Sequence, residues 1–286
     1  MNKKILYICI IGAPNSGKST LLNTIVNQKI SIASYKPHTT RNNIKGIITK
    51  NNTQLIFIDT PGYLKKAKYQ IEKSITKQCL KEIKNIDFIC IVIDISKEHC
   101  LKNPLINIIQ IKSNKKIILI FNKIDLIKEK KILLHMAQIA KNKGFDNIFM
   151  ISAINNKNVQ SLLNYLLNNS FEENWYYKPN KFTNKTTKEL AEDMTMEQIY
   201  KILKKEIPYN IKINTELWRE EKKHILIHQT IKIKKQNQKI IILGKKGCNI
   251  KKISIQSKKQ IEILSNKKIH LYLFIKIKEK YMNNIS

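Results

Sequence analysis

The segment GAPNSGKS, residues Gly12–Ser19, constrains the fold of this chain more than any other feature of its sequence. It follows an apolar run of strand length, residues 5–11, and opens a segment of helical spacing, residues 18–28. A strand, a glycine-rich turn and a helix start together present inward-facing backbone N–H groups that suit phosphate oxygens. The segment therefore predicts a bound nucleoside triphosphate, with Lys18 reaching its β and γ phosphates and Ser19 binding Mg²⁺.

Residues 4–168 alternate apolar runs of strand length with longer amphipathic segments, which is typical of an α/β fold. Runs such as FICIVID and KIILIF are apolar on both faces, as strands in a covered parallel sheet must be. One pair departs from the alternation, because Asn51 and Asn52 predict a hairpin and hence one antiparallel strand. The expected strands are 5–11, 43–50, 53–59, 87–93, 116–121 and 147–151, and the expected helices are 18–28, 70–84, 102–112, 129–142 and 156–168.

The motif FNKID indicates which base is bound. It places Asn122, Lys123 and Asp125 at the carboxyl end of an apolar strand, where doubly wound sheets bind ligands. A carboxylate there accepts from the ring N1–H and exocyclic amine of guanine, an edge that adenine lacks. Adenine would leave this carboxylate without hydrogen-bond partners and would therefore bind poorly, so Asp125 predicts specificity for guanine.

Three further segments complete the predicted nucleotide site. FIDTPG supplies Asp59 as a second Mg²⁺ ligand and Gly62, whose N–H group senses a γ-phosphate. KPHTTRNN supplies Thr40 as a third Mg²⁺ ligand, and the backbone of MISA is expected near the guanine carbonyl. The predicted catalytic residues are Lys18, Thr40 and Gly62, and the predicted nucleotide contacts are Gly12, Ala13, Pro14, Asn15, Ser16, Gly17, Lys18, Ser19, Thr20, Asp59, Thr60, Pro61, Gly62, Asn122, Lys123, Asp125, Ser152 and Ala153.

The rest of the chain has a different composition and a clustered positive charge. Of a net charge of +32, residues 222–286 contribute 17 lysines against two acidic residues. Clustered lysines favour a polyanionic partner through counterion release, although a solvated lysine face or a genomic bias toward lysine also produces such a count. Here we expect a small α+β unit: a helix, two extended segments, a strand KIIIL, the turn GKKG, a helix from about 248 and a last strand KIHLYLFIKIK.

These motifs, in this order, resemble the Era family within the translation-factor-like branch of the small GTPases. Asn15, the TTR at 39–41 and DTPG resemble Era segments, and so do EIPYNIKI, QKIIILGKKGCNIKKI and LFIKIKEKY toward the C-terminus. The resemblance implies a P-loop GTPase domain with a doubly wound, mostly parallel sheet over residues 1–170. It further implies a linker over 171–187 and a type II KH domain over 188–286.

The resemblance also implies activity and partners. It implies slow hydrolysis of GTP to GDP with Mg²⁺, since Tyr63 stands where some GTPases place a glutamine, and K⁺ as a second cation at Asn15. The KH signature GxxG implies contacts with the 3′ end of small-subunit (16S) rRNA in biogenesis of the 30S subunit. The predicted RNA contacts are Gly244, Lys245, Lys246, Gly247, Lys251 and Lys252.

Two other functions stay open at this stage. In one, the first domain is a scaffold for a constitutive RNA-binding module, against which the complete set of GTPase motifs argues. In the other, the basic C-terminal region lies on anionic lipid at the inner face of the cell membrane. The sequence has no export signal and no apolar run long enough to span a membrane, so we expect a cytoplasmic protein. We also expect it to be a monomer.

Overall fold

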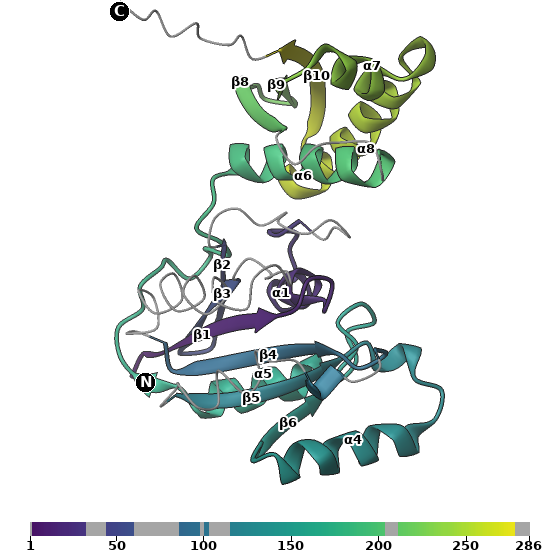
Figure 1. Cartoon of the computed structure of the whole chain (residues 1–286). Helices are drawn as coiled ribbons and strands as arrows, with labels where there is room; N and C mark the ends of the chain where they lie inside the picture. Colours follow the sequence, from purple (N-terminus) through teal and green to yellow (C-terminus); the bar gives the residue numbers. More distant parts are fainter. Residues whose placement is uncertain are drawn as a thin grey trace, which may run out of the picture. The chain divides into compact units, whose positions relative to one another are not determined.

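The computed structural model describes residues 2–32, 44–59, 86–97, 100–102, 115–203 and 211–277. The chain divides into two compact units, Met1–Asn184 and Lys185–Ser286. Each has its own sheet, as Figure 1 shows.

The first unit is built on a sheet in the order β2-β3-β1-β4-β5-β6. Only β2 runs antiparallel along this path, pairing with β3, and Asn51 in the turn between them has φ of +53°. The strands are β1 (Lys4–Gly12), β2 (Ile44–Lys50), β3 (Thr53–Asp59), β4 (Phe88–Asp94), β5 (Lys116–Asn122) and β6 (Asn147–Met150). The mostly parallel doubly wound sheet and its hairpin are therefore confirmed.

Helices cover the sheet because its central strands are apolar on both faces. All seven residues of β3 and of β4 are buried. Helices α1 (Lys18–Val26) and α5 (Val159–Asn168) contact each other and β3, whereas α4 (Lys130–Asn142) contacts β6. Short 3-10 turns lie at Cys100–Lys102 and Ile124–Leu126. The predicted helix 70–84 and nearly all of 102–112 lie outside the described residues.

The segment that we expected to be a linker belongs largely to the first unit. Its strand β7 (Phe171–Glu172) pairs antiparallel with β1. Tyr177 exchanges two hydrogen bonds of 2.9 Å with the Gln54 side chain, and the N–H of Ile47 donates to the carbonyl of Phe182. The first unit therefore extends to Asn184, because the segment satisfies a backbone N–H of the edge strand β2 and the side-chain amide of Gln54 in β3.

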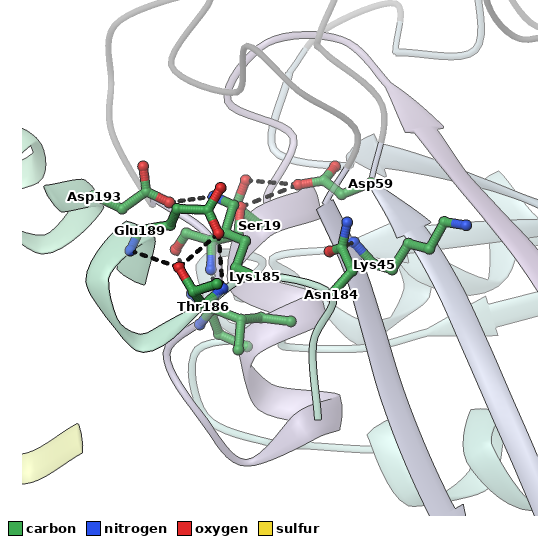
Figure 2. A network of polar contacts seen from close by, with 11 residues as sticks. Ser19, Lys45, Asp59, Asn184, Lys185, Thr186, Glu189 and Asp193 are labelled. Atoms are coloured by element: carbon green, nitrogen blue, oxygen red, sulfur yellow. Dashed lines mark hydrogen bonds and ion pairs between the residues drawn. The ribbon is translucent and has the colours of Figure 1, made fainter. Parts of the chain in front are cut away.

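The second unit packs helices on one face of a three-stranded sheet with the order β10-β9-β8. Strands β8 and β9 are antiparallel and β9 and β10 are parallel. A capping box starts α6, in which Thr186 and Glu189 satisfy each other's backbone N–H groups (Figure 2). The elements are α6 (Thr187–Ile202), β8 (Lys212–Glu220), β9 (His224–Ile233), α7 (Gln236–Leu243), a 3-10 turn (Lys245–Gly247), α8 (Cys248–Ser265) and β10 (Lys268–Ile277).

The prediction of a strand at KIIIL was wrong, because this run lies in α7. Gln238 accepts hydrogen bonds from the backbone N–H groups of Lys234 and Lys235 and so caps the start of the helix. Ile242 is 1% exposed and Ile240 is 66% exposed, so the run is buried on one helical face only. Four consecutive apolar residues do not distinguish a strand from a short helix.

Candidate nucleotide site and candidate RNA surface

The loop between β1 and α1 approaches neighbouring strands too closely for side chains at its two glycines. Gly17 has φ of +96°, and a Cβ there would lie 2.1 Å from Nδ2 of Asn122. A Cβ at Gly12 would lie 2.3 Å from the carbonyl oxygen of Val92. Asn15, which is exposed, takes φ of +65°, a conformation that asparagine adopts more readily than most residues. The absence of side chains at these glycines thus allows the loop to lie close against β4 and β5.

The ammonium group of Lys18 lies within the curve of this loop. Its Nζ donates to the carbonyl oxygens of Gly12 at 3.0 Å and Ala13 at 2.9 Å. Burial lowers the pKa of Lys18, and the negative charge of Asp59 opposes that shift. A buried positive charge at the start of a helix is well placed to neutralise phosphate oxygens.

Two predicted Mg²⁺ ligands lie together at the end of β3. The hydroxyl of Ser19 donates to Oδ2 of the buried Asp59 at 3.2 Å (Figure 2). Ser31, which was not predicted, donates to the same oxygen at 3.2 Å, and the Asn23 side chain holds it by accepting from its N–H. Hydroxyl and carboxylate oxygens are the ligands that Mg²⁺ prefers, so Ser19 and Asp59 fit this ion.

Asn122 joins the phosphate-binding loop to the predicted base-binding segment. Its Nδ2 donates to the carbonyl of Ser16 at 2.8 Å, and its Oδ1 accepts from the N–H of Ala153 at 3.0 Å. The hydroxyl of Thr24 in α1 donates to the carbonyl of Ala153 at 2.8 Å and reinforces the connection. The sequence placed Asn122 at the site but did not indicate that it acts as a brace.

The two other predicted residues of FNKID have different environments. Lys123 forms an ion pair of 2.6 Å with Asp94 at the end of β4. Burial raises the pKa of Asp94, but hydrogen bonds from Lys123 and Ser96 outweigh it, so the pKa lies below its usual value. Asp125 is exposed in the 3-10 turn that follows, where its carboxylate can accept from a ligand. Asp94 was not predicted; the only signal for it in the sequence was that an acidic residue ends the apolar run FICIVID.

The MISA segment is held by a turn of its own. Ser152 is buried and exchanges backbone hydrogen bonds with Lys157, at 3.1 Å and 3.0 Å. Asn156 and Asn158 in this turn take φ of +53° and +60°, so asparagines supply the left-handed conformations that the turn needs. The predicted residues Thr40, Thr60, Pro61 and Gly62 lie outside the described residues.

The GKKG turn lies between α7 and α8 and also requires its glycines. Gly244 and Gly247 have φ of +71° and +74°, and a Cβ at Gly244 would lie 2.7 Å from the Asn249 side chain. Four exposed lysines lie just before α8 or within its first five residues: Lys245, Lys246, Lys251 and Lys252. Positive side chains and a helix N-terminus together suit the phosphates of a nucleic acid.

Family models match both units. A model described as a 50S ribosome-binding GTPase matches residues 7–123, and a KH domain model matches residues 187–281. GTPase Era of Rickettsia conorii is 37% identical over 99% of this chain and 83% of that protein. GTPase Era of Agrobacterium fabrum is 35% identical over 96% of this chain and 87% of that protein.

Solved structures agree over nearly the whole chain. Era in complex with MgGDPNP and nucleotides 1506–1542 of 16S ribosomal RNA has a TM-score of 0.85 at 28% identity, covering 98% of this chain and 95% of that one. An Era variant from Aquifex aeolicus bound to GDP·AlF₄⁻ also has a TM-score of 0.85, covering 97% and 95% of the two chains. With its paired GTPase and KH units, this chain belongs to the Era family of GTPases.

Proposed function

We propose that this GTPase binds the 3′ region of 16S rRNA through its second unit and acts as a nucleotide-controlled switch in assembly of the 30S subunit. The observation that carries this proposal is the GKKG turn, with its four exposed lysines at the start of α8. In KH domains such a loop clamps the backbone of about four nucleotides. The match to an Era structure in complex with this RNA supports the choice of rRNA.

The first unit carries the groups that GTP hydrolysis needs. Phosphoryl transfer to water requires mainly positioning and neutralisation of charge, and Lys18 with the loop N–H groups provides both. Ser19 and Asp59 would hold Mg²⁺, which neutralises charge on the phosphates when it is bound. Asp125 would select guanine over adenine. Asn122 fixes the position of the phosphate-binding loop relative to the base-binding segment through its bonds to Ser16 and Ala153.

Binding to RNA tests the main proposal directly. Fluorescence anisotropy of the full chain would compare a single strand of the 16S 3′ end with a scrambled strand of equal length. We expect tighter binding to the rRNA strand, and we expect Lys245→Ala with Lys246→Ala to weaken it. The plot of log affinity against log salt has a negative slope, and its magnitude should decrease by about 1.4, because each of the two lost single-strand phosphate contacts contributes about 0.7. Equal affinity for both strands would contradict the proposal.

We also propose that K⁺ binds as a second cation at the phosphate-binding loop. Asn15 is exposed in the loop, and its side-chain oxygen is a suitable ligand for K⁺ beside the phosphates. GTP hydrolysis should then be faster in KCl than in NaCl, and Asn15→Ala should remove the difference. Equal rates for the unaltered chain in the two salts would eliminate the K⁺ site.

We further infer a monomeric protein of the cytoplasm that also contacts the inner face of the cell membrane through its lysines. None of the described helices has the length and apolar character needed to cross a bilayer. The lysine-rich second unit suits an anionic surface. Flotation with anionic vesicles would test the membrane contact, and light scattering would test the monomer. Absence from the vesicle fraction would disprove the contact.

A further inference from the structure

The sheet of the second unit has a face that the helices of this unit do not cover. Ile225, Ile227 and Ile231 of β9 pack into the core on the helix side, as do Ile269 and Leu271 of β10. Because side chains alternate along a strand, the intervening residues point to the opposite face. We call this side the outer face, and its residues include His228, Thr230 and Lys232 of β9 and Lys268, His270, Tyr272, Phe274 and Lys276 of β10.

Two aromatic rings are exposed side by side on the outer face. Tyr272 is 52% exposed and Phe274 is 46% exposed, and they are successive residues on this side of β10, about 6.6 Å apart along the strand. The ring of His228 contacts both, with centroids 5.2 Å from Tyr272 and 5.6 Å from Phe274. These edge contacts hold the two rings in place on a rigid element.

The charge around the rings is mainly positive. Lys232, Lys268 and Lys276 flank them along β9 and β10. Glu216 of β8 forms an ion pair with Lys276 at 3.2 Å, so that acid is already paired. Exposed flat rings between lysines are complementary to a chain of phosphates that carries unpaired bases.

We propose that the outer face is a second binding surface for single-stranded RNA. Tyr272 and Phe274 stack two unpaired bases, and Lys232 and Lys268 contact the phosphates on either side. Aromatic residues on an open sheet stack two or three bases in this way in other RNA-binding folds. A lipid surface, by contrast, is usually met by the apolar side of an amphipathic helix rather than by rings on a flat sheet. The inference rests on the proposed RNA-binding function and extends it, because GKKG lies in the helical layer on the other side of the sheet.

Affinity for RNA strands of two lengths tests this inference in the full chain. A tetranucleotide fills only the groove beside GKKG, whereas a strand of about 12 nucleotides can reach both surfaces. The doubly substituted variant Tyr272→Ala with Phe274→Ala should bind the longer strand about 5- to 150-fold more weakly for each lost stack. Its affinity for the tetranucleotide should be unchanged.

Matched variants separate stacking from stability. Tyr272→Leu with Phe274→Leu keeps apolar bulk on the sheet but removes the flat rings, so it should lose affinity like the alanine variant. Tyr176→Ala removes a 70% exposed tyrosine from the first unit and should not change RNA binding. Photocrosslinking of a 4-thiouridine strand should label Tyr272 or Phe274.

The outcomes distinguish this inference from the function on which it rests. If the GKKG lysine variant loses RNA affinity while both ring variants keep it, the outer face does not bind RNA and the proposed function stands. If the unaltered chain binds neither strand, the proposed function itself fails. Loss of binding to anionic vesicles, or of self-association, in ring variants that keep full RNA affinity would also overturn the inference.

Discussion

Replacing Asn122 by alanine should both destabilise the first unit and weaken its binding of guanine nucleotides. The substitution removes the acceptor for the Ala153 N–H and the donor for the Ser16 carbonyl. Ser16 is 1% exposed and Ala153 is 2% exposed, so water does not readily replace the lost partners. Each buried group left without a partner costs about 1–3 kcal/mol, so we expect a loss of about 2–6 kcal/mol in the free energy of unfolding.

Urea denaturation followed by tryptophan fluorescence would measure this loss. The chain has two tryptophans, and a Trp218→Phe background leaves only Trp175, which reports on the first unit. Titration with GDP would measure the loss of nucleotide affinity. We expect this loss because Asn122 connects the phosphate-binding loop to the base-binding segment.

The matched control is Asn164→Ala in the same background. Asn164 is exposed on α5 and accepts one hydrogen bond from Gln160 at 2.7 Å, so its loss should change stability by no more than about 0.5 kcal/mol. If Asn122→Ala destabilises the unit no more than Asn164→Ala does and keeps its GDP affinity, the brace has no energetic role.

Three further variants test other parts of the structure. Gly46→Ala would place a Cβ 2.4 Å from the Leu22 side chain, so calorimetry should show a loss of about 1–3 kcal/mol from overpacking. Asp94→Asn should reduce stability at pH 7. Because the pKa of Asp94 is lowered in the fold, its ionised carboxylate stabilises the fold above about pH 4, and this stabilisation is lost as the pH falls. The free energy of unfolding of the variant should therefore decrease less on acidification than that of the unaltered chain. Lys18→Met should slow single-turnover GTP hydrolysis by about 10²–10³-fold, whereas an unaltered rate would remove Lys18 from the mechanism.

The central strands of the first unit were predictable because most of their residues are apolar on both faces. FICIVID and KIILIF have this pattern, and the structure places both within the sheet as β4 and β5. The helix α7 was not predictable from KIIIL, since its run of apolar residues carries no period. The signal that could have identified it was Gln238, which caps the start of the helix.

The site was predictable where one motif carries one role, and less so where distant residues cooperate. The sequence indicates Lys18, Ser19 and Asp59 from local motifs. It does not indicate that Ser31 shares the Asp59 carboxylate, because that contact depends on how the loop after α1 folds back. Likewise, Asp94 pairs with Lys123 only because β4 and β5 are adjacent in the sheet.

The central claim is that this GTPase uses its second unit to bind the 3′ end of 16S rRNA. Crosslinking in cell extract with a GTP analogue or with GDP, followed by sequencing of the bound RNA, tests it most directly. We predict enrichment of small-subunit 3′ ends that depends on the nucleotide and is lost with Lys245→Asp and Lys246→Asp. Recovery of RNA fragments without enrichment of those ends would contradict the account.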